Sequence, residues 1–288
     1  MASLSIWLRA LRPRQWLKNG FVVAAALISG HAVDLDAMLR VAGAALVFCL
    51  AASGGYLLND VLDRDADRRD PIKSRRPVAA GELKVPNALM GAFVLMAAAV
   101  AMSLVLGRSV FACLAGYVVL SMLYSLTLKT VPVLEAMVLA TGFVVRLVAG
   151  ALAIPVPISQ WLLICGFLLA LLLAFGKRVP EVEHPTARTP RYPASFLTES
   201  VTLLAGVTLV AYVLYTVAPD TVAKVHSNAL LLTAPVVLFG ILRYLFLLGR
   251  QGSQDPTTAL FSDRPLLASV VVWAALAGCI VYFVAGRM

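Results

Sequence analysis

LNDVLDRDADRRDPIKSRRPVAAG, from Leu58 to Gly81, follows an apolar run and is the most charged stretch of a very apolar chain. On a helix each residue advances by about 100°, so Asp60, Asp63 and Asp67 fall on one face with Asn59 beside them. Hard oxygen ligands suit Mg²⁺, which usually takes one or two carboxylates and completes its shell with water and phosphate. The spacing at the end of an apolar run therefore favours a magnesium site over a solvated loop of mixed charge.

Three basic side chains follow the aspartates at once: Lys73, Arg75 and Arg76. Arginine forks and lysine ammonium groups are the usual protein partners of phosphate oxygens. We expect them to hold the phosphate oxygens that the metal ion leaves unbound.

The composition places this stretch in a membrane protein. Of the 288 residues, 61% are hydrophobic and 14% are charged, whereas a soluble domain has about 25% charged residues. Nine apolar runs approach or reach the length of about 20 residues that spans a bilayer. They cover roughly 19–33, 38–58, 86–107, 109–128, 133–154, 158–176, 199–217, 228–248 and 265–285. We expect one all-α integral membrane domain over residues 1–288, a bundle of about nine transmembrane helices.

The basic residues are divided unevenly between the two ends of these runs. Eighteen Lys and Arg lie in the N-terminal segment and in the loops after runs two, four, six and eight, and four lie on the other side. Because cytoplasmic loops are rich in these residues, we expect the N-terminus in the cytoplasm and the chain in the inner membrane. The longer loops then share the cytoplasmic side, where they would cap a cavity with an active site facing the cytoplasm.

The net charge of +9 needs no nucleic acid to explain it, since no basic repeats alternate with aromatic residues as in chains that stack on bases. Positive loops and anionic lipids account for the charge. The four cysteines lie in apolar runs without metal-ligand spacing. We therefore expect a membrane partner and no nucleic acid.

Other candidates lie at the same mouth or within a run. Lys129, just after Tyr124 and Ser125, is either an interfacial anchor that extends to the polar region or a phosphate ligand. Arg146 lies well inside the fifth run, where a charge costs several kcal/mol, so it faces a structural partner or a substrate cavity. Lys177 and Arg178 end the sixth run, and the pattern favours an anion site there.

At the N-terminus, LRPRQWLKN from Leu11 to Asn19 is basic and carries a tryptophan suited to the membrane interface. The simplest interpretation is an amphipathic helix that lies in the membrane plane. Its cations, Arg12, Arg14 and Lys18, also suit the phosphate of a lipid that enters from the inner leaflet.

Taken together, these motifs resemble one family. Asn59-Asp60-x-x-Asp63-x-x-x-Asp67 at the end of the second run, with eight or nine spans, resembles the UbiA superfamily of intramembrane prenyltransferases. LRPRQWLKN, YSLTLK, GFVVRLVAG, PISQW, GKR and SDRPL extend the resemblance along almost the whole chain. This set resembles the branch that makes decaprenylphosphoryl-5-phosphoribose.

The resemblance implies a reaction in which 5-phosphoribose moves from phosphoribosyl pyrophosphate to a polyprenyl phosphate and pyrophosphate is released. It implies Mg²⁺ as the cofactor and a role in making precursors of cell-envelope polysaccharide. Asp60, Asp63 and Lys129 would be catalytic, and Asp67 would join the two aspartates as a metal ligand. The residues that would bind the donor are Asn59, Lys73, Arg75, Arg76, Tyr124, Lys129, Arg146, Lys177, Arg178 and Glu181.

Two other functions remain open at this point. A related enzyme could move a prenyl group from a prenyl diphosphate to an aromatic or other small acceptor, but aromatic prenyltransferases of the superfamily usually carry a second aspartate-rich motif where this chain has Glu181-x-Glu183. A lipid carrier is the second alternative, although the charges gather at one mouth instead of at mid-membrane. A homo-oligomer is compatible with all three functions.

Overall fold

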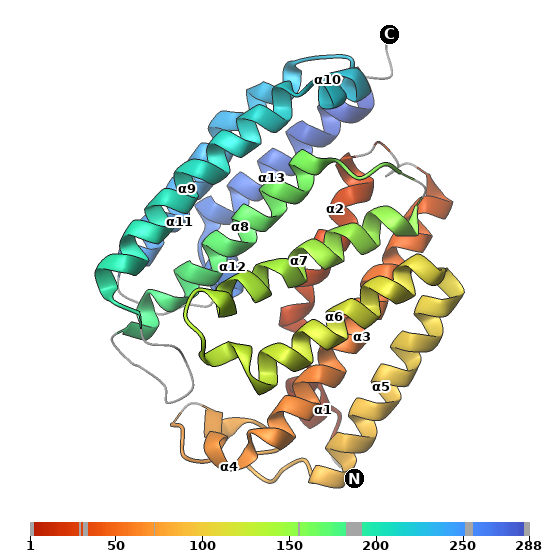
Figure 1. Ribbon diagram of the computed structural model, residues 1–288, viewed down its shortest axis with the longest axis vertical. Coiled ribbons are helices and arrows are strands. Elements are labelled where there is room, and N and C mark those ends of the chain that lie inside the picture. The colour runs from red at the N-terminus through yellow and green to blue at the C-terminus, as the bar shows by residue number, and fades with distance from the viewer. Residues whose placement is uncertain are drawn as a thin grey trace.

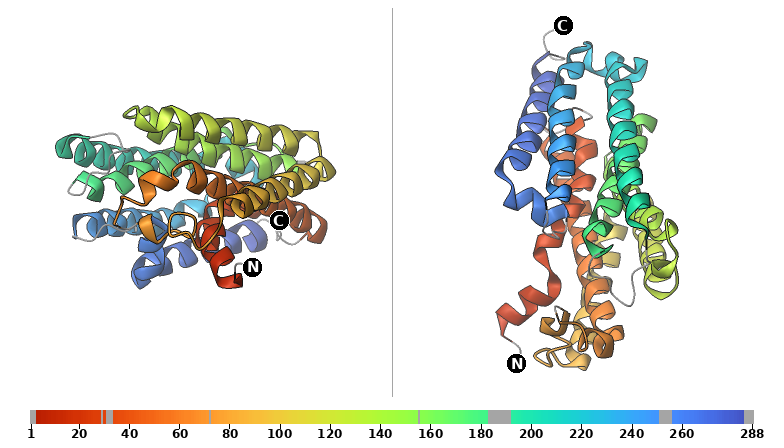
Figure 2. Two further views of the ribbon diagram at one scale, coloured as in Figure 1. Left: turned by 90° about the horizontal axis from the view of Figure 1, so that it is seen from below. Right: turned by 90° about the vertical axis from the view of Figure 1, so that its left-hand side faces the viewer.

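The computed structural model describes residues 3–28, 30, 34–71, 73–154, 156–182, 192–250 and 256–284. Within these ranges the regular structure is helical and contains no strand (Figure 1). Most of the long helices lie side by side, and the segment after the second apolar run projects from one end together with the N-terminal helix (Figure 2). The all-helical bundle that the composition predicts is confirmed.

Eight described helical segments are long and apolar enough to cross a membrane. They are α3 (Leu35–Leu62), α5 (Val85–Leu106), α6 (Arg108–Leu126), α7 (Leu134–Ala153), α8 (Gln160–Arg178), α9 (Ala194–Val217), α11 (Ala234–Gly249) with the preceding 3-10 helix η5 (Ala229–Thr233), and α13 (Arg264–Cys279) with the π-helical turn η6 (Ile280–Val284). Each matches one predicted span to within a few residues. Large apolar side chains, such as Phe93 and Val105, are exposed on them and would contact lipid. The chain is therefore a multi-pass membrane protein.

Shorter elements connect these helices. They are α1 (Leu4–Leu11), η1 (Pro13–Asn19), α2 (Gly20–Ile28), α4 (Arg64–Asp67), η2 (Lys73–Arg75), η3 (Leu128–Thr130), η4 (Pro180–Val182), α10 (Pro219–Val225) and α12 (Pro256–Ser262). The predicted span 19–33 contains α2, which has 9 residues and rises about 1.5 Å per residue, well short of a bilayer core of about 30 Å. Residues 29 and 31–33 lie outside the described part of the chain, so a ninth span stays a prediction.

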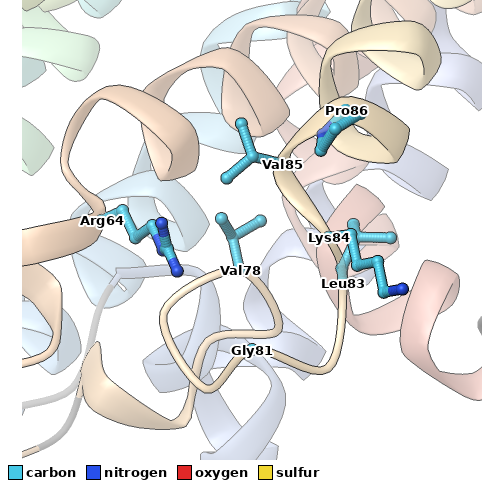
Figure 3. Close-up of a pocket in the computed structure, with 7 residues that line it drawn as sticks. All are labelled: Arg64, Val78, Gly81, Leu83, Lys84, Val85 and Pro86. Atoms are coloured by element: carbon cyan, nitrogen blue, oxygen red, sulfur yellow. The ribbon is translucent and has the colours of Figure 1, made fainter.

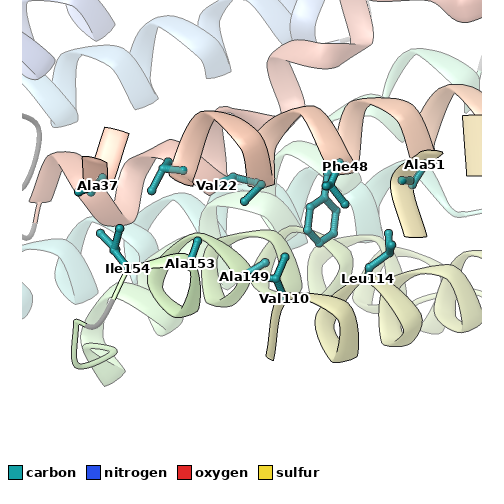
Figure 4. Close-up of a cluster of buried hydrophobic side chains, with 14 residues drawn as sticks. Val22, Ala37, Phe48, Ala51, Val110, Leu114, Ala149, Ala153 and Ile154 are labelled. Atoms are coloured by element: carbon teal, nitrogen blue, oxygen red, sulfur yellow. The ribbon is translucent and has the colours of Figure 1, made fainter. Parts of the chain in front are cut away.

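The main apolar core lies between α2 and α3 on one side and α6 and α7 on the other (Figure 4). Phe48 of α3 is fully buried at its centre, with Val110 and Leu114 of α6 beneath it. Small residues on α7, including Ala149 and Ala153, allow the helices to approach closely, which is the usual packing mode inside a membrane. This core holds the ends of α3 and α6 at one mouth of the bundle.

The 100° spacing assumed one continuous helix through the aspartate segment, and this assumption is wrong. The helix α3 ends at Leu62, and Asp63 takes φ −94° and ψ 2°, the sparsely allowed region in which turns are found. The short helix α4 then restarts at Arg64. The break turns Asp67 back toward the bundle, where the basic segment after it folds over the mouth.

A charged pair joins the last two spans at the same mouth. Asp263 caps α13 by accepting from the N–H of Leu266 at 2.8 Å, and both its oxygens accept from Arg243 of α11, at 3.1 and 2.8 Å. These hydrogen bonds hold the pKa of Asp263 below its ordinary value. The polar loop before α13 therefore has a structural role in joining α11 and α13.

We predict that Gly150→Ala destabilises the bundle. A Cβ at Gly150 would lie 1.9 Å from the carbonyl oxygen of Val22, so α2 and α7 would have to separate. Overpacking of this kind costs about 1–3 kcal/mol. Gly116→Ala in α6 is the matched control, because nothing lies within 4 Å of its Cβ position. Thermal unfolding in detergent should show a lower melting temperature for Gly150→Ala only, and equal values for the two variants would contradict the prediction.

Candidate active site

Four charged side chains meet where α3 leaves the bundle. Asp60 is 1% exposed, and its Oδ1 accepts from Nη2 of Arg12 at 2.5 Å. Nη1 of Arg76 lies between two carboxylates, 3.3 Å from Oδ1 of Asp60 and 2.7 Å from Oδ2 of Asp67. Two buried carboxylates are thus neutralised by two guanidinium groups, and we call Arg12, Asp60, Asp67 and Arg76 the carboxylate–arginine cluster.

A buried oxygen of the cluster lacks a partner in the part of the chain that the structure describes. Oδ2 of Asp60 is buried and makes no hydrogen bond within the described residues. A buried carboxylate oxygen without a donor is costly, and it suggests that a cation or a donor group is to be supplied from outside the chain. As a hard, negatively charged ligand, this carboxylate oxygen suits a hard cation such as Mg²⁺.

Asp63 faces a different cation. Its Oδ1 lies 3.8 Å from Nζ of Lys129, which sits in η3 between α6 and α7. The two residues are far apart in the sequence, and this contact brings the end of α6 to the aspartate segment. Lys129 is therefore part of the same mouth as the three aspartates, as the sequence predicted.

The three predicted metal ligands do not form a ready-made cage. No group of three or more His, Cys, Asp or Glu side chains converges as a metal site among the described residues. Each aspartate is instead paired with a cation of the chain. A magnesium ion at this mouth would have to take one or two of these carboxylates and find its remaining ligands in water or phosphate, which is its usual behaviour.

A second charged cluster lies on the other side of the mouth, and the sequence analysis missed its central residue, Glu135. Glu135 is fully buried in the first turn of α7, and both its oxygens accept from Arg178 of α8, at 2.8 and 2.7 Å. Nη1 of Arg178 also donates to Glu181 at 2.5 Å. A carboxylate inside a predicted span was the available signal, because such a residue must find a partner in the interior.

Two tyrosines complete this second cluster. Tyr124 of α6 donates to Oε2 of Glu135 at 3.5 Å, and Tyr192 donates to Oε1 at 3.4 Å. Burial raises the pKa of Tyr192, so its hydroxyl stays protonated and remains a donor. Val133 adopts φ 65°, which is rare for a β-branched residue, and its N–H donates to Tyr192 at 2.7 Å. The cluster joins α6, α7, α8 and the segment before α9.

The remaining candidates occupy varied positions. Lys73 pairs with Asp70 at 3.7 Å, and Arg75 is exposed near it. Asn59 and Lys177 are half-buried. In the N-terminal segment, Arg14 is exposed and Lys18 is half-buried. Arg12, the third cation of this segment, belongs to the carboxylate–arginine cluster. Glu183 lies outside the described residues.

Arg146 lies apart from both clusters. Its Nε donates to Asn19 at 2.7 Å, its Nη1 to the carbonyl of Gly142 at 2.8 Å and its Nη2 to Tyr117 at 3.0 Å. The guanidinium carbon also lies 4.4 Å from the centre of the Tyr117 ring, a favourable cation–π distance. All three nitrogens have partners of the chain, which favours a structural role over the donor-binding role that the sequence also left open.

A cavity of about 330 Å³ opens between α4 and the start of α5 (Figure 3). Arg64 reaches from α4 toward Val78, and Lys84 lies across the loop that carries Gly81. None of the predicted site residues lines it. This cavity is therefore distinct from the mouth formed by the two charged clusters.

We predict that Glu135→Gln destabilises the protein strongly. The glutamine amide would place N–H donors against the guanidinium of Arg178 and leave that buried charge without its main partner. Breaking a buried pair costs roughly 3–5 kcal/mol. Glu181→Gln, which alters the more exposed contact of the same arginine, is the control and should cost less. Melting temperatures would check this, and an unchanged value for Glu135→Gln would contradict it.

Known proteins are similar to this chain in sequence and in architecture. The profile of the UbiA prenyltransferase family matches residues 20–270. A decaprenyl-phosphate phosphoribosyltransferase of Mycolicibacterium smegmatis is 32% identical over 96% of this chain and 92% of its own length. Its namesake in Mycobacterium tuberculosis H37Rv is 31% identical over 96% of this chain and 94% of its own length.

The fold agrees with these relatives. A UbiA homologue from Archaeoglobus fulgidus, solved with GPP and Mg²⁺, superposes with a TM-score of 0.71 at 19% identity, over 96% of this chain and 99% of the other. The sequence match covers most of the residues that build the bundle and includes the aspartate segment. The chain belongs to the UbiA prenyltransferase family.

Proposed function

We propose that the chain transfers 5-phosphoribose from phosphoribosyl pyrophosphate to a polyprenyl phosphate and releases pyrophosphate, with Mg²⁺ as the cofactor. The observation that carries the proposal is the match over 96% of the chain to relatives named for decaprenyl-phosphate phosphoribosyl transfer. A homologue of the same fold has been solved with GPP and Mg²⁺, which supports a metal-dependent transferase.

The charges at the mouth suit these substrates. The donor carries a pyrophosphate and a 5-phosphate, and the acceptor is a third anion. Lys129 and the two arginines of the carboxylate–arginine cluster place three cations at the mouth, each beside a carboxylate that a metal ion would take over. Lys73, Arg75 and Lys177 add positive charge nearby. With Mg²⁺ bound to the carboxylates, these cations would be available to the phosphate oxygens of the donor and the acceptor.

The proposed reaction needs no strong general base. An oxygen of the acceptor phosphate attacks C1 of the ribose while the bond from C1 to the pyrophosphate oxygen breaks, and the acceptor oxygen is already ionised. Bound Mg²⁺ would neutralise charge on the leaving pyrophosphate. Asp60 and Asp63 would hold it, and Asp67 would bind it or orient its water. Lys129, Arg12 and Arg76 would position the anions, which is the main source of rate in such a site.

The setting of the reaction is also a proposal. The distribution of Lys and Arg supports a cytoplasmic N-terminus and an active site that faces the cytoplasm. Arg14 and Lys18 lie in η1, next to the amphipathic α1, and would meet a lipid phosphate arriving from the inner leaflet, whereas Arg12 faces Asp60. We further propose that residues 1–288 act as one domain, alone or as a homo-oligomer, in making precursors of cell-envelope polysaccharide.

The decisive experiment supplies purified protein in lipid with Mg²⁺, phosphoribosyl pyrophosphate and a polyprenyl phosphate, and follows the lipid by mass spectrometry. We expect a new lipid that is heavier by one phosphoribosyl group, and none with EDTA. Absence of product with several chain lengths, from a folded protein, would contradict the proposal. Prenyl diphosphates with small acceptors would then be tested.

Matched aspartate variants identify the metal ligands. Asp60→Asn and Asp63→Asn should lower the rate on the order of 100-fold or more, since each removes a charge that holds the metal and its pyrophosphate. Asp65→Asn is the control, because this aspartate lies in the same segment but its side chain is 84% exposed. Full activity of Asp60→Asn and Asp63→Asn at limiting Mg²⁺ would exclude the assigned ligands.

Arg146→Lys separates the structural role of this residue from a role in donor binding. A lysine cannot reproduce the three contacts of Arg146, so we expect a loss of about 1–3 kcal/mol in the free energy of unfolding. The KM for phosphoribosyl pyrophosphate should stay unchanged in the folded fraction. Arg76→Gln is the comparison and should raise that KM. A raised KM for phosphoribosyl pyrophosphate in Arg146→Lys would indicate that Arg146 binds the donor.

A further inference from the structure

Arg12 contacts the carboxylate that the proposed function assigns to the metal, although the sequence placed Arg12 in a lipid-phosphate site. Its Nη2 lies 2.5 Å from Oδ1 of Asp60, a charge-assisted hydrogen bond. The side chain of Arg12 is 27% exposed, while that of Asp60 is 2% exposed. One edge of the guanidinium therefore reaches solvent at the mouth, and the other neutralises a buried charge.

The backbone that carries Arg12 is held firmly. The hydroxyl of Ser53 on α3 donates to the carbonyl of Leu11 at 2.9 Å, and it accepts from the indole of Trp16 at 3.0 Å. Arg12 itself takes φ 54°, the left-handed region that few non-glycine residues adopt. The side chain of Arg12 is therefore presented to α3 from a segment that is itself hydrogen-bonded to α3.

A second partner for the guanidinium is already in place. The carbon Cζ of Arg12 lies 5.0 Å from the centre of the Tyr56 ring, one turn before Asp60 on α3. Cation–π contacts at this distance are favourable. If Arg12 left Asp60, the ring of Tyr56 would keep the guanidinium beside the mouth, within reach of an anion bound there.

Charge balance shows when Arg12 has to leave. Asp60 and Asp67 carry two negative charges, and Arg12 and Arg76 carry two positive ones. A divalent cation bound to Asp60 would give this partly buried group a net charge of +2, which is costly because water reaches only its outer edge. An arriving anion such as a pyrophosphate group removes that excess and offers Arg12 a new partner.

We propose that Arg12 is a displaceable counter-cation of Asp60 that couples binding of the metal to binding of the phosphate donor. Without ligands, Arg12 neutralises Asp60 and keeps the affinity for Mg²⁺ low. With Mg²⁺ and a pyrophosphate group bound together, the carboxylate of Asp60 would hold the metal and the guanidinium of Arg12 would donate to a phosphate oxygen. This inference rests on the proposed function for the assignment of Asp60 to the metal, and it makes Arg12 a positioning residue for the donor.

The test measures binding of Mg²⁺ and of inorganic pyrophosphate by calorimetry, on the full-length protein in lipid nanodiscs. In the wild type, pyrophosphate should raise the affinity for Mg²⁺, and Mg²⁺ should raise the affinity for pyrophosphate by the same factor. In Arg12→Gln, Mg²⁺ alone should bind about tenfold more tightly or better, and the coupling factor should fall by about tenfold or more.

Two further variants keep the test decisive. Arg9→Gln removes a cation of α1, the helix that ends just before Arg12. Arg9 pairs with Glu82, outside the cluster, so this variant should leave both affinities unchanged. Arg12→Met keeps a long side chain against Tyr56 and replaces Arg12→Gln if that variant does not fold. An Mg²⁺ affinity that is equal to or weaker than that of the wild type in the folded Arg12 variant would overturn the inference.

The readouts distinguish this inference from the proposed function. Mg²⁺ and pyrophosphate binding does not depend on which group the enzyme transfers. If Arg12 couples the two binding events but no phosphoribosyl group is transferred, the inference about Arg12 holds and the proposed donor is wrong. Phosphoribosyl transfer with unaltered coupling in the Arg12 variants would support the proposed function and overturn the inference about Arg12.

Discussion

The burial of Asp60 is the constraint on which the rest of the mouth depends. A carboxylate that is 1% exposed at the end of a membrane-spanning helix must be neutralised. The chain meets this need from two directions, with Arg12 from the N-terminal segment and Arg76 from the loop after α4. These two contacts fold both segments over the end of α3, so the same charges that suit a metal and a phosphate also shape the site.

The second charged cluster gives the opposite side of the mouth its rigidity. Glu135 and Arg178 form a bidentate pair in which both side chains are almost completely buried. Such a pair contributes little net stability, but removing one partner is expensive, so it fixes the arrangement of α7 against α8. With Asp63 and Lys129 joining α3 to the end of α6, the mouth is lined by helix ends whose relative positions are set by ion pairs.

The two clusters would have different roles in the proposed reaction. The carboxylate–arginine cluster combines carboxylates with cations that can exchange partners, which suits a metal–pyrophosphate complex that must arrive and leave. The Glu135–Arg178 pair is closed and satisfied, and it positions Tyr124. Arg146 belongs to neither cluster and stabilises the interior through Asn19 and Tyr117. Charge inside this bundle therefore has three distinct uses.

The sequence by itself determined eight spans and the position of the aspartates at the end of one of them, because the length and polarity of a segment are local properties. The break of the helix at Asp63 was visible only in the structure. It also placed Lys129 at the mouth. Only the tertiary structure decided the partners: Arg12 with Asp60, 48 residues apart, Arg178 with Glu135, 43 apart, and Arg146 with Asn19, 127 apart. Pairing depends on which helix ends meet after packing, and a single sequence carries no record of that. For the same reason the contact of Arg12 with Asp60 was not foreseen and Glu135 was overlooked.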